Sequence, residues 1–169
     1  MSTQIFQQQV WPLRERLYRV AFRLLGERAE AEDVVQEAMI KLWERREELP
    51  GIKNVEGWCI RIVRNHGIDR YRSRKRRTST GLEQAAELVD PTPDPSAQLQ
   101  TRDMQKRIHR LIQKLPEQRR MVLQLREIDG LSYREIAEQL KISLDQVRTD
   151  IHRGRMALRA ALLKNPCHE

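Results

Sequence analysis

The sequence lacks several features on which whole classes of protein depend. It has no apolar run near the roughly 18 residues that a membrane-spanning helix needs. Its first residues, MSTQIFQQQVWPLRER, do not combine a basic segment with an apolar stretch as a secretory signal does. Its two cysteines, Cys59 and Cys167, are too few for a disulfide framework or a metal-binding knuckle. We therefore expect a chain that stays in the cytoplasm and holds no metal.

Groups that would support catalysis are missing as well. The seven glycines are scattered and form no loop that would cradle a phosphate. No serine–histidine–aspartate set and no pair of carboxylates stands out. Cys59 and His66 continue the apolar stripe of a helix, which predicts that both pack in a core. We expect no catalytic residue, no cofactor and no small-molecule substrate, and hence no enzyme.

The composition favours helices. Aromatic residues make up only 5% of the chain and charged residues 33%, a balance typical of amphipathic helices rather than of a thick β core. Apolar spacing predicts one helix that ends at Gly26, with Pro12 in its first turn or in a kink just before it. A second helix is stopped by Pro50-Gly51, and a third runs from about Val55 to Arg76. The predicted fold class is all-α.

The formal net charge of +8 is unevenly distributed. Residues 1–77 hold 17 basic and 11 acidic residues, and residues 101–169 hold 15 and 9. Between them, residues 78–100 hold four acidic residues, no basic residue and three prolines. Such a segment neither continues a helix nor buries much apolar surface. We predict two small helical domains, residues 1–77 and 98–169, joined by a flexible acidic linker over residues 78–97.

Two helix starts lie close together in the second domain. Ser132-Tyr-Arg-Glu135 and Ser143-Leu-Asp-Gln146 both fit the capping box, in which the serine and the Glu or Gln side chain bond each other's backbone N–H groups. They leave about two turns of helix, a short turn, and a longer helix from Leu144. This layout predicts a helix-turn-helix between Leu131 and about Leu163 that places its second helix in the major groove of DNA. A helical hairpin with a solvated, charged face is the alternative.

A second basic surface is expected in the first domain. Six of the eight residues from Arg70 to Arg77 are basic, which indicates either a nucleic-acid track or a solvated helix end. One flank of the helix that leads into this basic run extends the track through Arg61, Arg64, Asn65, Ile68 and Arg72. The helix before that has a mixed polar face that would suit a protein partner, formed by Asp33, Gln36, Glu37 and Lys41.

Three segments, in this order, resemble the extracytoplasmic-function (ECF) sigma factors of bacteria. They are AEDVVQEAMIKLW, EGWCIRIVRNHGIDRYRSRKRR and LPEQRRMVLQLREIDGLSYREIAEQLKISLDQVRTDIHRGR. The resemblance covers both predicted domains. It implies a sigma region 2 domain over residues 1–77 and a sigma region 4 domain over residues 98–169. The implied function is to bind RNA polymerase core and to direct promoter-specific transcription initiation.

The resemblance also implies roles for individual residues. Docking on polymerase core is expected of Asp33, Val34, Gln36, Glu37, Lys41 and Trp43. Recognition and melting of the −10 element is expected of Lys53, Asn54, Arg61, Arg64, Asn65, Asp69, Arg72, Arg74 and Lys75. Recognition of the double-stranded −35 element is expected of Ser143, Gln146, Arg148, Thr149, His152 and Arg153. An anti-sigma factor is a further expected partner.

Two positions depart from the family's pattern. The family commonly has a basic residue where this chain has Asp150, and a glycine or asparagine where it has Lys141. A carboxylate that faced phosphates would repel them. We therefore expect Asp150 to accept from a cytosine amino group or to pair with Arg148 or Arg153.

Two other classes remain open on the sequence alone. A free-standing helix-turn-helix regulator would bind its operator tightly by itself and would not bind polymerase core. A helical RNA-binding or adaptor protein would be indifferent to promoter sequence. A sigma factor is favoured because a regulator has no need for a basic helix end beside an acidic docking helix.

Overall fold

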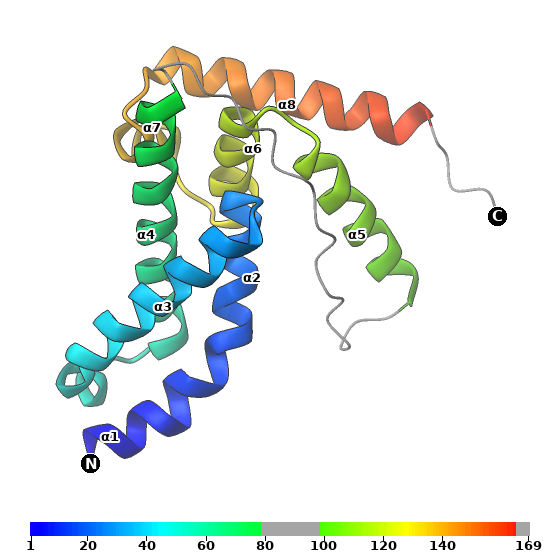
Figure 1. Cartoon of the computed structure of the whole chain (residues 1–169). Coiled ribbons are helices and arrows are strands. Elements are labelled where there is room, and N and C mark those ends of the chain that lie inside the picture. Colours follow the sequence, from blue (N-terminus) through cyan, green and yellow to red (C-terminus); the bar gives the residue numbers. More distant parts are fainter. Residues whose placement is uncertain (79–98, 165–169) are drawn as a thin grey trace. The chain divides into compact units, whose positions relative to one another are not determined.

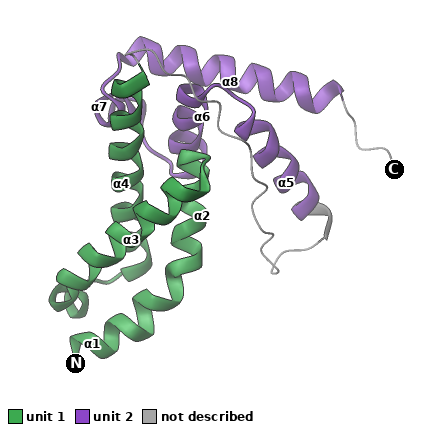
Figure 2. Cartoon of the chain, in the orientation of Figure 1, with its two compact units in different colours: residues 1–91 green, residues 92–169 purple. Residues whose placement is uncertain are grey.

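The computed structural model describes residues 1–78 and 99–164, and every secondary-structure element within those residues is a helix (Figure 1). The chain forms two compact units, residues 1–91 and 92–169 (Figure 2). The prediction of an all-α protein with two helical domains is confirmed. The predicted acidic linker lies outside the described residues from position 79 onward.

The N-terminal part of the first unit is a bent helical segment. α1 (Ser2–Ile5), a π-helical turn η1 (Phe6–Val10) and a 3-10 turn η2 (Trp11–Leu13) lead into α2 (Arg14–Leu25). Pro12 lies in η2, just before α2, so its missing N–H costs no hydrogen bond inside that helix. α2 ends at Gly26, whose φ of 71° is a left-handed conformation that glycine adopts without steric cost. Both predictions for this segment are confirmed.

α3 (Arg28–Glu44) and α4 (Val55–Thr78) complete the first unit. The prediction that α3 continues to Pro50-Gly51 is wrong, because the α-helix ends at Glu44 and a 3-10 helix, η3 (Arg46–Gly51), follows it. Pro50 has no N–H to donate to the Arg46 carbonyl and disfavours the α conformation at Leu49, so a regular α-helix does not run through this stretch, which forms a short 3-10 helix instead. The tighter path still buries Leu49.

The core of the first unit lies between α2, α3 and α4, which all pack on one another. Its buried side chains recur at helical spacing and include Leu17, Ala21, Leu24, Val34, Val35, Ala38, Leu42, Cys59, Ile62 and Val63. Cys59 is fully buried as predicted, and burial raises the pKa of its thiol to about 11. Ile68 and Tyr71 of α4 are also buried, at 3% and 2% exposure. The prediction that Ile68 lies on the nucleic-acid flank is therefore wrong.

The second unit contains four α-helices within the described residues. They are α5 (Leu99–Gln113), α6 (Glu117–Leu123), α7 (Tyr133–Leu140) and α8 (Leu144–Lys164), with a π-helical turn η4 (Gln124–Ile128) after α6. α6, α7 and α8 share a core that includes Met121, Val122, Leu125, Ile136, Leu140, Val147 and Ile151. α8 crosses α6 at Gly154, where a Cβ atom would lie 2.6 Å from Leu123 Cδ1. The absence of a side chain at Gly154 therefore sets how closely these two helices approach.

Candidate nucleic-acid interface

The helix-turn-helix begins with a complete capping box at α7. The Glu135 N–H donates to Ser132 Oγ at 3.2 Å, and the Ser132 N–H donates to Glu135 Oε2 at 2.7 Å. Leu131, which precedes the cap, and Ile136, in the first turn of α7, are both buried, as the two residues of a hydrophobic staple are. The first predicted capping box is confirmed.

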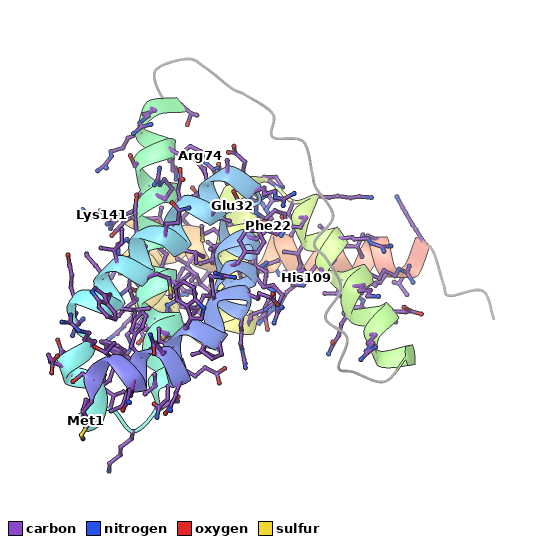
Figure 3. The ribbon with its side chains drawn as sticks, turned by 60° about the horizontal axis from the view of Figure 1, so that its bottom comes forward. Met1, Phe22, Glu32, Arg74, His109 and Lys141 are labelled. Atoms are coloured by element: carbon purple, nitrogen blue, oxygen red, sulfur yellow. The ribbon has the colours of Figure 1, made fainter. Side chains whose placement is uncertain are left out.

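Lys141 forms the turn between α7 and α8 (Figure 3). Its φ of 54° and ψ of 47° are left-handed, a conformation that costs a residue with a Cβ about 1–2 kcal/mol. Glycine and asparagine enter this conformation more readily. The departure at Lys141 therefore puts strain into the turn.

The second capping box forms only in part. The Gln146 N–H donates to Ser143 Oγ at 3.1 Å, which confirms the serine cap of α8. The Gln146 side chain does not complete the box, because its Nε2 donates to Asp150 Oδ2 at 3.2 Å. The expectation that Gln146 reaches back to the serine N–H is wrong, and Asp150, one turn further along α8, is the reason.

The outward face of α8 presents the polar residues that the sequence predicted. Gln146, Arg148, His152 and Arg153 are exposed and Thr149 is half-buried. Arg148 Nη1 lies 3.1 Å from Asp145 Oδ1 in an exposed ion pair. Exposed pairs of this kind contribute about 0–1 kcal/mol, so this guanidinium is readily available to a phosphate or a base.

Asp150 does not lie on that face. It is 4% exposed and accepts from Gln118 Nε2 of α6 at 2.7 Å as well as from Gln146. The expectation that Asp150 faces DNA or pairs with Arg148 or Arg153 is wrong. The carboxylate lies on the buried, inward stripe of α8, between Val147 and Gly154.

The outer flank of α4 gathers most of the residues predicted for the −10 element. Lys53, Arg61, Asn65 and Asp69 are exposed, and Arg64 and Arg72 are half-buried. Asn54 caps the start of the helix, because its Oδ1 accepts from the Gly57 N–H at 2.9 Å. Arg72 Nη2 lies 2.6 Å from Asp69 Oδ1, one turn before it.

Arg74 has an intramolecular role that the sequence did not indicate. Its guanidinium pairs with Glu30 of α3 at 2.5 Å and donates to the Leu25 carbonyl oxygen of α2 at 3.2 Å. Burial raises the pKa of Glu30, and the nearby Arg74 charge acts in the opposite direction. Arg74 thus holds the end of α4 against α2 and α3, whereas Lys75 beside it is exposed.

The polar face of α3 is exposed at Asp33, Gln36 and Lys41. Val34, which the family resemblance placed among the docking residues, is fully buried and belongs to the core. Glu37 turns toward α4, where its carboxylate lies 2.9 Å from Arg70 Nη2 and 3.7 Å from His66 Nδ1.

The comparisons with known proteins place the chain in a family. Sigma-70 region 2 matches residues 12–77, and Sigma-70, region 4 matches residues 105–158. The ECF RNA polymerase sigma factor SigW of Bacillus subtilis (strain 168) is 34% identical over 157 residues, which cover 88% of this chain and 84% of SigW. The chain belongs to the ECF RNA polymerase sigma factors. It is therefore a transcription initiation factor that binds RNA polymerase core and directs promoter-specific initiation.

Other relatives agree with this assignment. The RNA polymerase sigma-H factor of Pseudomonas aeruginosa is 30% identical over 157 residues, which cover 88% of this chain and 81% of that protein. The sigma factor RpoE of Bartonella quintana, solved in complex with the anti-sigma factor NepR, is 24% identical with a TM-score of 0.57. That likeness covers 95% of this chain and 98% of RpoE, and shows that the two share a fold.

This sigma factor also has an apolar groove that the sequence did not reveal. Trp43 is 40% exposed, packs edge-on against Phe6 at 5.1 Å, and lies under the Arg46 guanidinium. An open hollow of about 640 Å³ is lined by Phe6, Gln7, Trp11, Met39, Ile40 and Trp43. Ile40, at 59% exposure, was the available signal, because it is an apolar residue on the polar side of α3.

Within the described residues 1–78 and 99–164, no helix has the length and apolar character to span a membrane. Within the same residues, no cluster of three or more histidine, cysteine, aspartate or glutamate side chains is arranged to hold a metal ion.

Proposed function

We propose that the two units of this sigma factor divide promoter recognition between them. In this proposal α8 binds the −35 element in the major groove, α4 binds and opens the −10 element, and α3 docks on polymerase core. The observation that carries it is the short α7, tight turn and long α8 with a polar outward face, formed by Gln146, Arg148, His152 and Arg153. A helix of this kind fits the major groove, which is about 12 Å wide.

The α4 surface is proposed for the −10 element because its exposed polar side chains follow one flank over several turns. The residues that we assign to it are Lys53, Asn54, Arg61, Arg64, Asn65, Asp69, Arg72 and Lys75. Basic side chains on such a track hold the phosphates, and amide side chains bond exposed bases. Arg74 contributes indirectly, by fixing the end of α4.

The α3 surface is proposed for polymerase docking. It combines exposed carboxylate and amide groups with a large exposed apolar area, a combination that suits a protein partner better than DNA. The residues that we assign to it are Asp33, Gln36, Glu37, Lys41 and Trp43. We propose that this protein works in the cytoplasm and that an anti-sigma factor restrains it.

The mechanism uses binding energy and no covalent chemistry. Docking on core would hold two DNA-binding surfaces at a fixed separation, so that weak contacts at each act together. Unstacking a base step costs about a few kcal/mol, and bases captured by α4 would repay that cost as the duplex opens.

Transcription reconstituted with bacterial core polymerase tests this assignment. The template is genomic DNA of the organism that encodes the chain, and transcript starts are mapped by sequencing. Arg148→Glu should abolish promoter-specific starts and leave core binding in a pull-down unchanged. Lys106→Glu, the same charge reversal on an exposed residue of α5, is the matched control and should support normal initiation.

Asp33→Arg should have the opposite effect, a loss of core binding, while Glu15→Arg on the exposed face of α2 should keep it. Unchanged initiation by the Arg148 variant would contradict the role of α8. Tight, sequence-specific DNA binding by the chain alone, without affinity for core, would instead identify a free-standing regulator.

A further inference from the structure

Asp150 is a buried acidic residue on the helix that we assign to the −35 element. Its Oδ2 accepts from Gln118 of α6 at 2.7 Å and from Gln146 of α8 at 3.2 Å. Only 4% of Asp150 is exposed, whereas Gln146 lies on the exposed side of the same helix. One carboxylate therefore joins the supporting helix α6 to an outward-facing amide.

The chemistry of the two groups fixes which way the Gln146 amide points. An ionised carboxylate only accepts hydrogen bonds, so the amide must present its nitrogen to Asp150. The amide nitrogen carries two N–H groups, and Asp150 takes one of them. The carbonyl oxygen and the second N–H then remain for a partner outside the helix, and they lie side by side when Asp150 takes the N–H that points away from the carbonyl.

The contrast with α7 shows that this orientation is specific to α8. At α7 the equivalent residue of the capping box, Glu135, folds back onto the Ser132 N–H. Gln146 has the same position relative to Ser143 but bonds Asp150 instead. The carboxylate one turn along therefore diverts Gln146 from helix capping and holds its amide at the surface.

An adjacent oxygen acceptor and N–H donor match one base in the major groove. Adenine presents an N6 amino donor beside the N7 acceptor, so both groups of the amide are satisfied. Guanine presents two acceptors, N7 and O6, and would leave the carbonyl oxygen of Gln146 facing an oxygen. Thymine offers an acceptor and a methyl group, and cytosine offers one amino group.

We propose that Asp150 is a positioning residue that orients Gln146 so that α8 selects adenine at one position of its DNA site. This inference rests on the proposed function of α8. Asp150 itself makes no contact with DNA. In this chain, the position at which the family commonly has a basic residue therefore holds a buried carboxylate that orients Gln146 from the inward side of α8.

Selection from a library of duplexes with a randomised segment tests the proposal. The full-length chain, assembled with bacterial core polymerase, is the binding species, and retained duplexes are sequenced. The wild-type complex should enrich adenine at one position, and Gln146→Ala should weaken that preference by about five- to a hundredfold, as loss of a bidentate contact does. Asp150→Ala should relax the same position and leave the other preferences unchanged.

A chemical change in the DNA sharpens the test. Replacing the selected adenine by 7-deazaadenine removes the N7 acceptor, so binding should weaken for the wild-type chain and not for Gln146→Ala. Gln118→Ala is the matched control. It removes the other donor to Asp150 without changing the outward face of α8, and it should keep the adenine preference.

The outcomes separate this inference from the proposed function. If the wild-type complex enriches no sequence, both are overturned. An enriched site without a Gln146-dependent adenine, or equal sensitivity of wild type and Gln146→Ala to 7-deazaadenine, overturns the inference alone. A folded Asp150→Ala complex that keeps the full adenine preference overturns the positioning role. Because Asp150 is buried, Asp150→Leu, which removes the acceptor and fills a similar volume, takes its place where the alanine variant unfolds.

Discussion

Gly154 offers a direct test of how α8 is held in place. A Cβ at this position would lie 2.6 Å from Leu123 Cδ1, 2.9 Å from Leu123 Cγ and 3.3 Å from Arg119 Cγ. Ordinary carbon–carbon contacts are about 3.5–4.0 Å, so Gly154→Ala must push α6 and α8 apart or displace a buried leucine. Overpacking of this kind costs about 1–3 kcal/mol. Replacing glycine by alanine inside a helix returns about 1 kcal/mol, which leaves a net loss of up to about 2 kcal/mol.

The decisive measurement is the same substitution in a Leu123→Ala background. Without the Leu123 side chain only the close contact with the flexible Arg119 side chain, at 3.3 Å, remains, so Gly154→Ala should then stabilise the protein by up to about 1 kcal/mol through helix propensity. All three tryptophans belong to the first unit, at positions 11, 43 and 58. The urea-induced transition that appears in far-UV circular dichroism and not in tryptophan fluorescence therefore reports the second unit. If Gly154→Ala changes the free energy of unfolding equally in both backgrounds, the explanation that Leu123 limits the approach of α6 and α8 is refuted.

Three other predictions concern single residues. Lys141→Gly should stabilise the second unit by about 0.5–1 kcal/mol in the same urea assay, because relief of about 1–2 kcal/mol of left-handed strain exceeds the entropy cost of glycine. Lys141→Ala keeps the strain and should not stabilise the unit. Ser132→Ala should cost about 1 kcal/mol and speed amide hydrogen exchange in the first turn of α7, and unchanged exchange would contradict the capping role. Cys59, in a Cys167→Ser background, should resist alkylation at pH 8, because its thiol is buried and neutral. Since folding raises the pKa of this thiol to about 11, its contribution to the free energy of unfolding is fully present below the ordinary thiol pKa and declines as the pH rises toward 11.

The sequence correctly predicted the features that depend on residues close together along the chain. The capping box at α7 is local chemistry between Ser132 and Glu135, so its spacing alone was sufficient. The left-handed end of α2 at Gly26 follows in the same way, because glycine is the residue that enters that conformation without cost. The two-unit, all-helical architecture followed from composition and from the position of the prolines.

Asp150 shows why a polar residue on an apolar stripe is difficult to place. Val147, Ile151 and Gly154 all face inward, and the three- and four-residue spacing puts Asp150 on the same stripe. The periodicity therefore indicated burial, whereas the charge indicated the surface. The conflict is resolved by Gln118, a donor on another helix 32 residues away, which sequence periodicity does not reveal.

The basic end of α4 likewise forms ion pairs with residues far away in the sequence, which periodicity and composition do not reveal. By composition, every basic residue from Arg70 to Arg77 was available to a nucleic acid. In the folded unit Arg70 pairs with Glu37 and Arg74 pairs with Glu30, across 33 and 44 residues of sequence. Both carboxylates belong to α3, so the helix proposed to dock on polymerase and the helix proposed to bind the −10 element share ion pairs. A partner that binds the Glu37 carboxylate competes directly with Arg70, and the two surfaces are therefore not electrostatically independent.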